Sequence, residues 1–374
     1  MIQPKAFIDA LAQGGIDFFA GVPDSLLKNL CAYITDSAPR EKNIIAANEG
    51  NAVGLAAGYH LATGKVGCVY MQNSGEGNIV NPLLSLVDED VYHLPMLLII
   101  GWRGEPGVHD EPQHKKQGKV TLSLLETMGV PYAVLDENWE QQVSKAVTTI
   151  HETNGVYALI VRKGTFAEYV LHRQTLSSLP LSREEAIKIV VDKLREDDIV
   201  VSTTGIISRE LFEYREAKHQ GHGADFLTVG SMGHASQIAL GIALQKPERR
   251  VFVFDGDGAL LMHMGGIAII GDYCPKNLVH IVFNNGAHDS VGGQPTVGQK
   301  IDIEAIAKAV GYADVVSVDT NMSLMFAMNH VNNAVIEGTS LINVNVRKGN
   351  RKDLGRPTTT PIQNKEVFMQ NLAK

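Results

Sequence analysis

The two halves of the chain repeat one pattern of segments, and this repeat limits the possible folds more than any other feature. In the first half, a small-residue stretch beginning at Glu49 (EGNAVGLAAGYHLATG) precedes the apolar run GCVYM and the glycine-rich segment NSGEGN. In the second half, ASQIALGIAL precedes VFVF and DGDG. Two further pairs, PMLLIIGWRG with VHIVFNNGAH and LIVRKGTF with VNVRKGNR, keep an offset near 184 residues. We interpret the repeat as two domains of one fold, although any two domains of that architecture share part of the pattern.

Apolar runs of strand length alternate with helical periods in both halves. The predicted strands lie at residues 18–20, 67–71, 96–100, 158–161, 199–202, 250–254, 279–283 and 342–346, with helices such as 51–62 and 236–244 between them. Such alternation indicates parallel sheets with helices on both faces. The predicted fold class is therefore α/β, with two similar doubly wound parallel-sheet domains. We place these domains at 1–172 and 183–374, joined by a linker at 173–182 that is rich in turn formers.

Composition excludes several classes of protein. The formal net charge is −8 and the pI is about 5.9, whereas nucleic-acid binders normally carry a basic surplus. The three cysteines form no C-x-x-C pair, which disfavours a disulfide framework or a zinc site and fits a reducing cytoplasm. The N-terminal residues show no signal-peptide pattern. The longest apolar run, 94–101, is far shorter than the roughly 20 residues of a membrane helix, so we expect no membrane association.

The most specific motif is Gly256-Asp257-Gly258, then 25 intervening residues, then Asn284-Asn285. Each part ends an apolar strand, so both reach the carboxyl edge of the sheet, where open α/β sheets bind ligands. A helix beginning near Ala259 would present free N–H groups that suit a phosphate. A carboxylate, an amide oxygen and a backbone carbonyl together suit Mg²⁺. A GDG alone is mostly an ordinary strand-end turn, but the second strand end at this spacing favours a metal site.

This pattern resembles the signature of thiamin-diphosphate enzymes. The resemblance implies that Asp257, Asn285 and the backbone of Ala287 hold Mg²⁺, with Gly258 and Ala259 beside the cofactor's diphosphate. It also implies a carboxylate near the pyrimidine N1′, in a stretch reading N-E-x-N-A. Asn48 to Ala52 reads NEGNA, so Glu49 is the candidate. An isolated Glu here would be an ordinary helix-start residue. The nearly uncharged helix that follows instead predicts a buried, perturbed carboxylate.

Further cofactor contacts follow from the same resemblance. In Gly230-Ser231-Met232-Gly233, Met232 would wedge the two cofactor rings into a V, and the Gly230 carbonyl would accept from the 4′-amino group. A lone methionine is otherwise core filling. We also expect Thr203, Thr204 and Gly205 to line the diphosphate or pyrimidine end of the cofactor site. The loop Asn73–Asn78 takes the place of GDG in the first domain, and Asn73 is a predicted cofactor contact.

The resemblance also implies an assembly. Family members place the cofactor between a pyrimidine domain and a diphosphate domain of different subunits, so we expect a homodimer or a larger homo-oligomer. The resemblance covers essentially the whole chain, with one departure. The middle domain of pyruvate decarboxylases and acetolactate synthases is missing.

The substrate is expected to be a small 2-oxo acid. Asp24 matches an active-site aspartate of the pyruvate decarboxylase type, and a proton donor is needed near the new carbanion. We predict Asp24 and His114 as catalytic residues. The predicted substrate-binding residues lie in the loop after the first strand, in the loop 102–119 and in the basic tail 347–361: Ser25, Arg103, Gln113, Lys115, Arg351 and Arg356. Each could equally be a solvated surface residue, although a basic cluster attracts anions.

The short two-domain build, the GVPDS and DEPQH loops and the RKDLGRPTTTP tail resemble the decarboxylases of 2-oxo acids that carry a phosphonate or sulfonate group. Three alternatives remain. A carboligase of the same fold is disfavoured by the missing middle domain. An inactive homologue should lack Glu49 or the metal pair, and both are present. A nucleotide-binding dehydrogenase is disfavoured because no G-x-G-x-x-G follows the early strand.

Overall fold

The computed structural model describes residues 1–173 and 178–374, so residues 174–177 of the predicted linker lie outside the described residues. The chain divides into two compact units. The first comprises Met1–Thr175 with Ser290–Gln294, and the second comprises Leu176–Asp289 with Pro295–Lys374. Within the described residues, no helix is long and apolar enough to cross a membrane.

The first unit is built around a six-stranded sheet in the order β2-β1-β3-β4-β6-β5, and every pairing is parallel. Its strands are β1 (Phe18–Gly21), β2 (Asn43–Ile45), β3 (Gly67–Gln72), β4 (Met96–Gly101), β5 (Tyr132–Val134) and β6 (Val156–Val161). Its helices are α1 (Pro4–Gln13), α2 (Lys28–Ser37), η1 (Arg40–Lys42), α3 (Glu49–Thr63), η2 (Asn73–Gly75), α4 (Glu76–Pro82), η3 (Leu83–Val87), α5 (Pro112–Thr127) and α6 (Trp139–Thr153).

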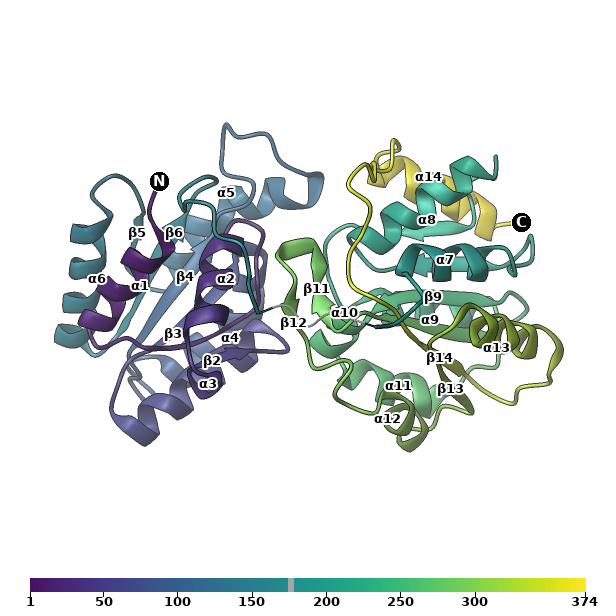
Figure 1. Cartoon of the computed structure of the whole chain (residues 1–374), viewed down its shortest axis with the longest axis horizontal. Helices are drawn as coiled ribbons and strands as arrows, with labels where there is room; N and C mark the ends of the chain where they lie inside the picture. The colour runs from purple at the N-terminus through teal and green to yellow at the C-terminus, as the bar shows by residue number, and fades with distance from the viewer. Residues whose placement is uncertain (174–177) are drawn as a thin grey trace. The chain divides into compact units, whose positions relative to one another are not determined.

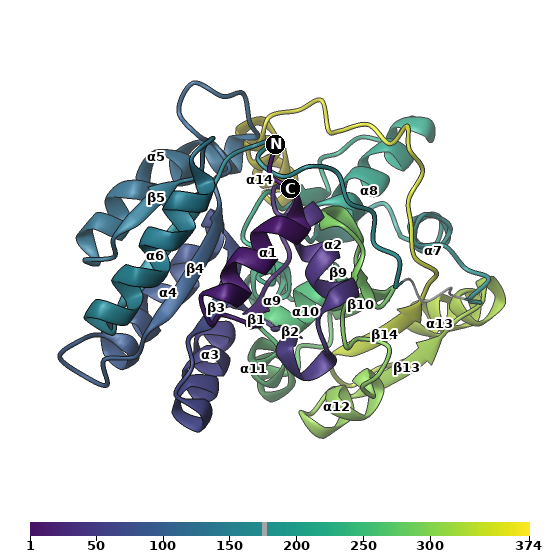
Figure 2. The ribbon, with the colours of Figure 1, turned by 60° about the vertical axis from the view of Figure 1, so that its left-hand side comes forward.

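Two apolar layers cover this sheet because its buried side chains alternate between the faces. Side chains of α1, α2 and α6 pack on one face, and those of α3, α4 and α5 pack on the other. Figures 1 and 2 show the helices on either side of the strands. The local sequence defines α3 well: the Asn48 side chain accepts from the Asn51 N–H at its start, and Gly64 ends it with a left-handed φ of 70°.

The second unit is built around the sheet β13-β14-β10-β9-β7-β8, again with parallel pairings throughout. Its strands are β7 (Ile199–Ser202), β8 (Asp225–Leu227), β9 (Val251–Gly256), β10 (Leu278–Asn284), β13 (Asp314–Val318) and β14 (Ser340–Asn345), beside a short sheet of β11 (Ala287–His288) and β12 (Gln294–Pro295). Its helices are α7 (Arg183–Val191), α8 (Ile206–Ala217), α9 (Ala235–Gln245), α10 (Asp257–Met262), α11 (Gly265–Tyr273), α12 (Ile303–Ala309), α13 (Asn321–Asn333) and α14 (Pro361–Leu372). The short helix η4 (Asp289–Val291) and the strand β12 each include residues of both units, because Ser290–Gln294 belongs to the first.

The predicted α/β fold with two similar sheets is confirmed. When the strands of each unit are numbered along the chain, both sheets have the order 2-1-3-4-6-5. In each sheet the direction of chain winding reverses between the first and third strands, and ligands of open α/β sheets bind beside such a point. Helices α7, α8 and α13 cover one face of the second sheet, and α9 to α12 with α14 cover the other.

Three local predictions were wrong. Asn73–Asn78 is not a loop, because η2 and the first turn of α4 occupy it. The predicted loop 102–119 ends at Glu111, because Pro112 begins α5, a position in which its missing N–H costs nothing. The helix expected near Ala259 begins two residues earlier, at Asp257.

Candidate functional site

Glu49 is the first residue of α3, and its side chain is buried, with only 4% of the residue exposed. The Asn78 side-chain amide donates to Glu49 Oε2 over 2.6 Å. Burial raises the pKa of the Glu49 carboxyl, and the hydrogen bond from Asn78 opposes this rise only in part. The position therefore has the poorly solvated carboxyl that the sequence predicted.

Gly75 packs directly against Glu49. A Cβ atom at position 75 would lie 2.5 Å from Cδ and Cγ of Glu49. The backbone of Gly75 has a φ of −77°, so the glycine is needed for this close approach and not for an unusual backbone conformation. Gly75, in the glycine-rich segment after β3, thus packs against the side chain of Glu49 at the start of α3.

The side chain of Asn73 is occupied by protein groups. Its amide accepts from the Arg103 N–H over 3.1 Å and donates to the Arg103 carbonyl over 2.8 Å. It also donates to Thr121 Oγ1 over 2.8 Å. Because β3 and β4 are neighbours in the sheet, Asn73 ties together the segments that follow both strands. A cofactor contact by this residue stays a prediction.

The sequence analysis overlooked Glu76, which begins α4 and is fully buried. Among the described residues, neither of its carboxyl oxygens has a hydrogen-bond partner. The hydroxyl of the nearby Thr121 opposes the rise in the Glu76 pKa, but its proton is donated to the Gln117 carbonyl. Burial raises the pKa of Glu76 to about 8, so this carboxyl is neutral at neutral pH.

Asp24 follows β1 and is completely buried. Burial raises its pKa to about 6, although the N–H groups of Leu26 and Leu27 donate to Oδ2 over 2.9 and 3.3 Å. The α-carbon of Gly101, at the end of β4, packs against the same oxygen, and a Cβ there would overlap it. Asp24 therefore lies beside the carboxyl ends of two strands of the first sheet.

A polar cluster joins the segments after β1 and β4. Arg103 Nη1 donates to Ser25 Oγ over 2.7 Å, and Arg103 Nε donates to Asp110 Oδ2 over 2.8 Å. His114 Nδ1 lies 2.9 Å from Asp110 Oδ1. The structure thus brings together the predicted residues Ser25, Arg103 and His114 around Asp110, which the sequence analysis had not selected.

Gln113 and Lys115, the other residues predicted in the loop 102–119, lie on the first turn of α5. Gln113 has a buried Oε1 with no hydrogen-bond partner among the described residues, whereas Lys115 is exposed. Lys115 makes no ion pair among the described residues. Gln113 is the better placed of the two to contribute an inward-facing polar atom.

In the second unit, Asp257 begins α10 and is 2% exposed. Burial raises its pKa to about 6, while Thr296 Oγ1 and the Asn285 N–H, both of which donate to the carboxylate, lower it. Thr296 had not been predicted. A bound cation would stabilise the charged form of this buried carboxylate, so the environment of Asp257 fits a metal ligand.

The two asparagines after β10 have different surroundings. Asn284 accepts from the Gly286 N–H over 3.2 Å and donates to the Gly298 carbonyl over 2.8 Å. Asn285 accepts from the Ala287 N–H over 3.0 Å, which leaves one lone pair of Oδ1 for a cation. A Cβ at Gly298 would lie 2.5 Å from Asp257 Oδ2 and 2.8 Å from Asn284 Oδ1. The Asp257 carboxylate and the Asn285 amide are hard oxygen donors of the kind that suits Mg²⁺.

Other predicted cofactor residues gather around α10. A Cβ on Gly258 would lie 3.4 Å from the Met232 methyl and 3.1 Å from His288 Cε1. Burial lowers the pKa of His288 to about 4, and no sequence motif had pointed to this residue. Thr204 Oγ1 accepts from the Gly230 N–H over 3.1 Å. Ala259 and Ala287 are both buried.

The end of β7 offers a further polar group. Thr203 Oγ1 is buried and has no hydrogen-bond partner among the described residues. Gly205 follows with a φ of 100° and precedes α8. A buried hydroxyl at a strand end without a hydrogen-bond partner suits a site where a bound ligand supplies that partner.

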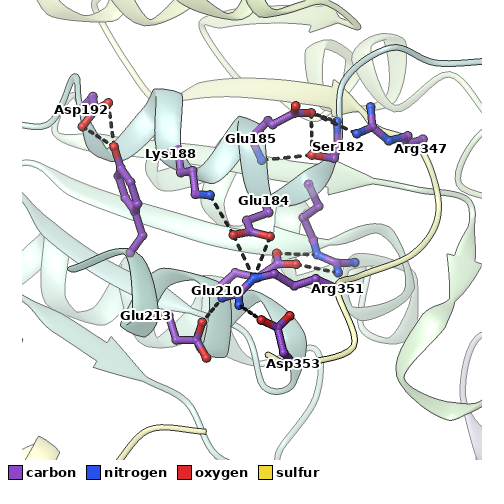
Figure 3. Close-up of polar contacts among 12 residues, drawn as sticks. Ser182, Glu184, Glu185, Lys188, Asp192, Glu210, Glu213, Arg347, Arg351 and Asp353 are labelled. Atoms are coloured by element: carbon purple, nitrogen blue, oxygen red, sulfur yellow. Dashed lines mark hydrogen bonds and ion pairs between the residues drawn. The ribbon is translucent and has the colours of Figure 1, made fainter. Parts of the chain in front are cut away.

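Two arginines of the basic tail form ion pairs with neighbouring carboxylates. Arg351 forms ion pairs with Glu184, Glu213 and Asp353, as Figure 3 shows. Arg347 pairs with Glu185 in the same view. Arg356 is exposed. The sequence suggested an anion site here, but carboxylates of α7 and α8 already pair with Arg347 and Arg351.

Comparison with known proteins agrees with this geometry. Residues 4–124 match the thiamine pyrophosphate enzyme, N-terminal TPP binding domain, and residues 203–344 match the thiamine pyrophosphate enzyme, C-terminal TPP binding domain. The chain belongs to the thiamine pyrophosphate enzyme family. Thiamin diphosphate, another name for this cofactor, is therefore the cofactor that the chain's family binds.

Three relatives are similar to the chain over almost its whole length. The chain is 33% identical to phosphonopyruvate decarboxylase of Streptomyces viridochromogenes, over 97% of this chain and 93% of the relative. It is 34% identical to phosphonopyruvate decarboxylase of Streptomyces hygroscopicus, over 96% and 92%. It is also 29% identical to sulfopyruvate decarboxylase of Methanosarcina acetivorans, over 92% and 91%. These relatives and both matched domains identify the chain as a decarboxylase of the thiamin-diphosphate family.

Proposed function

We propose that the protein decarboxylates 3-phosphonopyruvate to phosphonoacetaldehyde and CO₂, with thiamin diphosphate and Mg²⁺, in the biosynthesis of phosphonates such as 2-aminoethylphosphonate. The observation that carries this proposal is the 33–34% identity to two phosphonopyruvate decarboxylases over almost the whole chain. The buried carboxyls of Glu49 and Asp257 support it, because a functional member of the family needs both groups. They also argue against an inactive homologue.

In this proposal the cofactor site takes a pyrimidine-binding domain from one subunit and a diphosphate-binding domain from another. Thiamin diphosphate supplies a carbon nucleophile that adds to the 2-oxo carbon and accepts the electron pair released as CO₂ departs. Glu49 would share a proton with the pyrimidine N1′, and its burial keeps that proton available. Asp257, Asn285 and the Ala287 carbonyl would hold Mg²⁺ against the diphosphate. Met232 and Gly230 would orient the pyrimidine ring.

Asp24 and His114 are the proposed catalytic residues on the substrate side. The pKa of Asp24, raised by burial to about 6, leaves a partly protonated carboxyl near neutral pH, which is suitable for delivering a proton. Ser25, Arg103 and Gln113 would bind the substrate's charged groups. Because Asp110 balances the charge of Arg103, recognition of a dianionic phosphonate would also draw on Lys115 and the N-terminus of α5.

Sulfopyruvate is the second candidate substrate, because a sulfopyruvate decarboxylase is 29% identical over 92% of the chain. A sulfonate carries a single charge, whereas a phosphonate carries up to two, so the two substrates differ mainly in the charge at C3. A carboligase would use the same cofactor site but would need a second carbonyl substrate. Products therefore distinguish these candidates better than cofactor binding does.

The test is the release of CO₂ and aldehyde from phosphonopyruvate, sulfopyruvate and pyruvate, each with thiamin diphosphate and Mg²⁺. The expected result is the highest kcat/KM for phosphonopyruvate and phosphonoacetaldehyde as its product. A preference for sulfopyruvate would overturn the proposed substrate but not the proposed decarboxylation. Absence of CO₂ from all three would overturn the proposed function.

We further propose a homodimer or larger homo-oligomer, with a pyrimidine-binding domain at 1–172 and a diphosphate-binding domain at 183–374. The two compact units of the chain support these domains. Three free cysteines, two of them buried, fit a cytoplasmic location. Sedimentation of the holoenzyme tests the assembly, and a monomer with full activity would contradict it.

A further inference from the structure

Asp110 accepts hydrogen bonds from four different residues. Oδ1 accepts from Arg103 Nη2, from the Glu111 N–H over 2.7 Å and from His114 Nδ1 over 2.9 Å. Oδ2 accepts from Arg103 Nε and from the Gly104 N–H, both over 2.8 Å. The side chain is largely buried, with 12% exposed. A carboxylate with both oxygens occupied in this way has one fixed orientation.

This arrangement determines the tautomer of His114. Burial acts to raise the pKa of Asp110, but its hydrogen bonds from Arg103, His114 and Gly104 outweigh burial and hold the pKa well below its ordinary value. The carboxylate is therefore ionised and can only accept, so His114 must carry its proton on Nδ1. Burial lowers the pKa of His114, so the imidazole is neutral at neutral pH and Nε2 keeps its lone pair.

The same carboxylate determines the orientation of Arg103. A guanidinium has five N–H groups. The forked pair with Asp110 uses Nε and one hydrogen of Nη2, and Ser25 Oγ takes one hydrogen of Nη1. Two N–H groups, one on each terminal nitrogen, have no partner among the described residues. The planar fork holds these two donors in a fixed direction.

From this geometry we propose that Asp110 is a positioning residue, which fixes the tautomer of His114 and the orientation of Arg103 so that both act on one 2-oxo acid substrate. This inference rests on the proposed function. Asp110 does not touch the substrate in this proposal. It determines that His114 presents a hydrogen-bond acceptor at Nε2 and that Arg103 presents two N–H donors. Because Asp110 cancels the charge of Arg103, the contribution is one of direction and not of long-range attraction.

Asp110→Asn is the sharpest test, because the amide has nearly the same shape but can both donate and accept. An amide N–H directed at His114 would move the imidazole proton to Nε2. Asp198→Asn is the matched control: Asp198 makes a similar buried fork with Arg250, but it precedes β7 and lies at the amino end of that strand. Both variants remove one charge from an Asp–Arg pair.

We expect Asp110→Asn holoenzyme to lose about 10- to 100-fold in kcat/KM, a range typical for loss of a group that orients a functional residue. Thiamin diphosphate affinity should stay unchanged. ¹⁵N spectra should show the proton of His114 on Nδ1 in the wild type and a larger share of it on Nε2 in the variant, with the signal assigned from His114→Gln. Asp198→Asn should change only thermal stability. Unchanged kcat/KM with an unchanged His114 signal would overturn the inference.

The wild-type spectrum alone keeps the inference open to refutation if Asp110→Asn does not fold. A proton on Nε2 of His114 in wild-type holoenzyme would overturn it. The result is also separable from the proposed function. If the wild type releases no CO₂ from any of the three 2-oxo acids, the proposed function fails, whereas the ¹⁵N spectra still decide whether Asp110 sets the tautomer of His114.

Discussion

The α-carbon of Gly75 lies against the carboxyl group of Glu49, with no room for a methyl group between them. We therefore predict that Gly75→Ala will displace Glu49. Overpacking of this kind costs about 1–3 kcal/mol. The fall in kcat should be larger than this loss of stability alone would cause, because the displaced carboxyl no longer reaches the cofactor. The measurements are kcat and the free energy of unfolding.

Gly77→Ala is the control for that prediction. Gly77 lies two residues further along, in α4, and a Cβ there would meet nothing within 4 Å. Alanine favours a helix more than glycine does, so this variant should keep its activity and gain slightly in stability. Equal losses of kcat in Gly75→Ala and Gly77→Ala would contradict the specific role of position 75.

Glu49→Gln should leave cofactor binding nearly intact and remove most turnover. The amide keeps the shape and the capacity to accept from Asn78, but it cannot exchange a proton with the pyrimidine. General acid–base groups contribute about 10²–10⁴-fold, so kcat should fall within that range. Calorimetric titration with thiamin diphosphate and steady-state kinetics test both parts, and undiminished kcat would refute the role of Glu49.

Glu76 should make the protein less stable as pH rises. Its pKa is about 8 in the folded chain, compared with an ordinary value of 4.5. Between these values the unfolded chain loses the proton and the folded chain keeps it, so the free energy of unfolding falls as pH increases through this window. Glu76→Gln should remove this decline. Melting temperatures measured from pH 4.5 to 8 provide the test, and parallel curves for both proteins would exclude the effect.

Asp257→Ala should abolish Mg²⁺-dependent binding of thiamin diphosphate. Loss of the carboxylate removes the charged ligand, and the remaining amide and carbonyl oxygens bind Mg²⁺ weakly. The exposed Asp197 supplies a control, because Asp197→Ala changes the net charge equally away from this cluster. Calorimetry with and without Mg²⁺ distinguishes the two variants. Normal affinity in Asp257→Ala would remove the basis for the metal site.

The architecture could be predicted from the sequence because long buried strands carry an unambiguous signal. Ile199–Ser202 was predicted with its observed bounds, and the predicted strands in the β3 and β9 regions differ from the observed ones by one or two residues at an end. The short edge strands β2 and β5 were missed, because three residues of intermediate burial have no clear periodicity. Helix α5 was missed because its first turns are charged and mimic a loop.

Residues of the candidate site could be selected from the sequence only where a motif encodes them. GDG, the paired asparagines and NEGNA each occupy a few adjacent residues, so they are visible in the sequence. Asp110 gains its importance from Arg103 and His114, which it meets only after α5 forms. Glu76 likewise becomes unusual only when packing excludes water from it. Neither could be distinguished from the other acidic residues by its neighbours in the chain.

The shared strand order gives the two sheets equivalent positions that carry different side chains. Asn73 and Asp257 follow equivalent strands and stand at the same point of the two folds. One copy of that position provides a carboxylate suited to a cation, and the other provides an amide that fastens the neighbouring segment through the peptide of Arg103. The same position of the fold thus carries a candidate metal ligand in one half and a structural hydrogen-bonding group in the other.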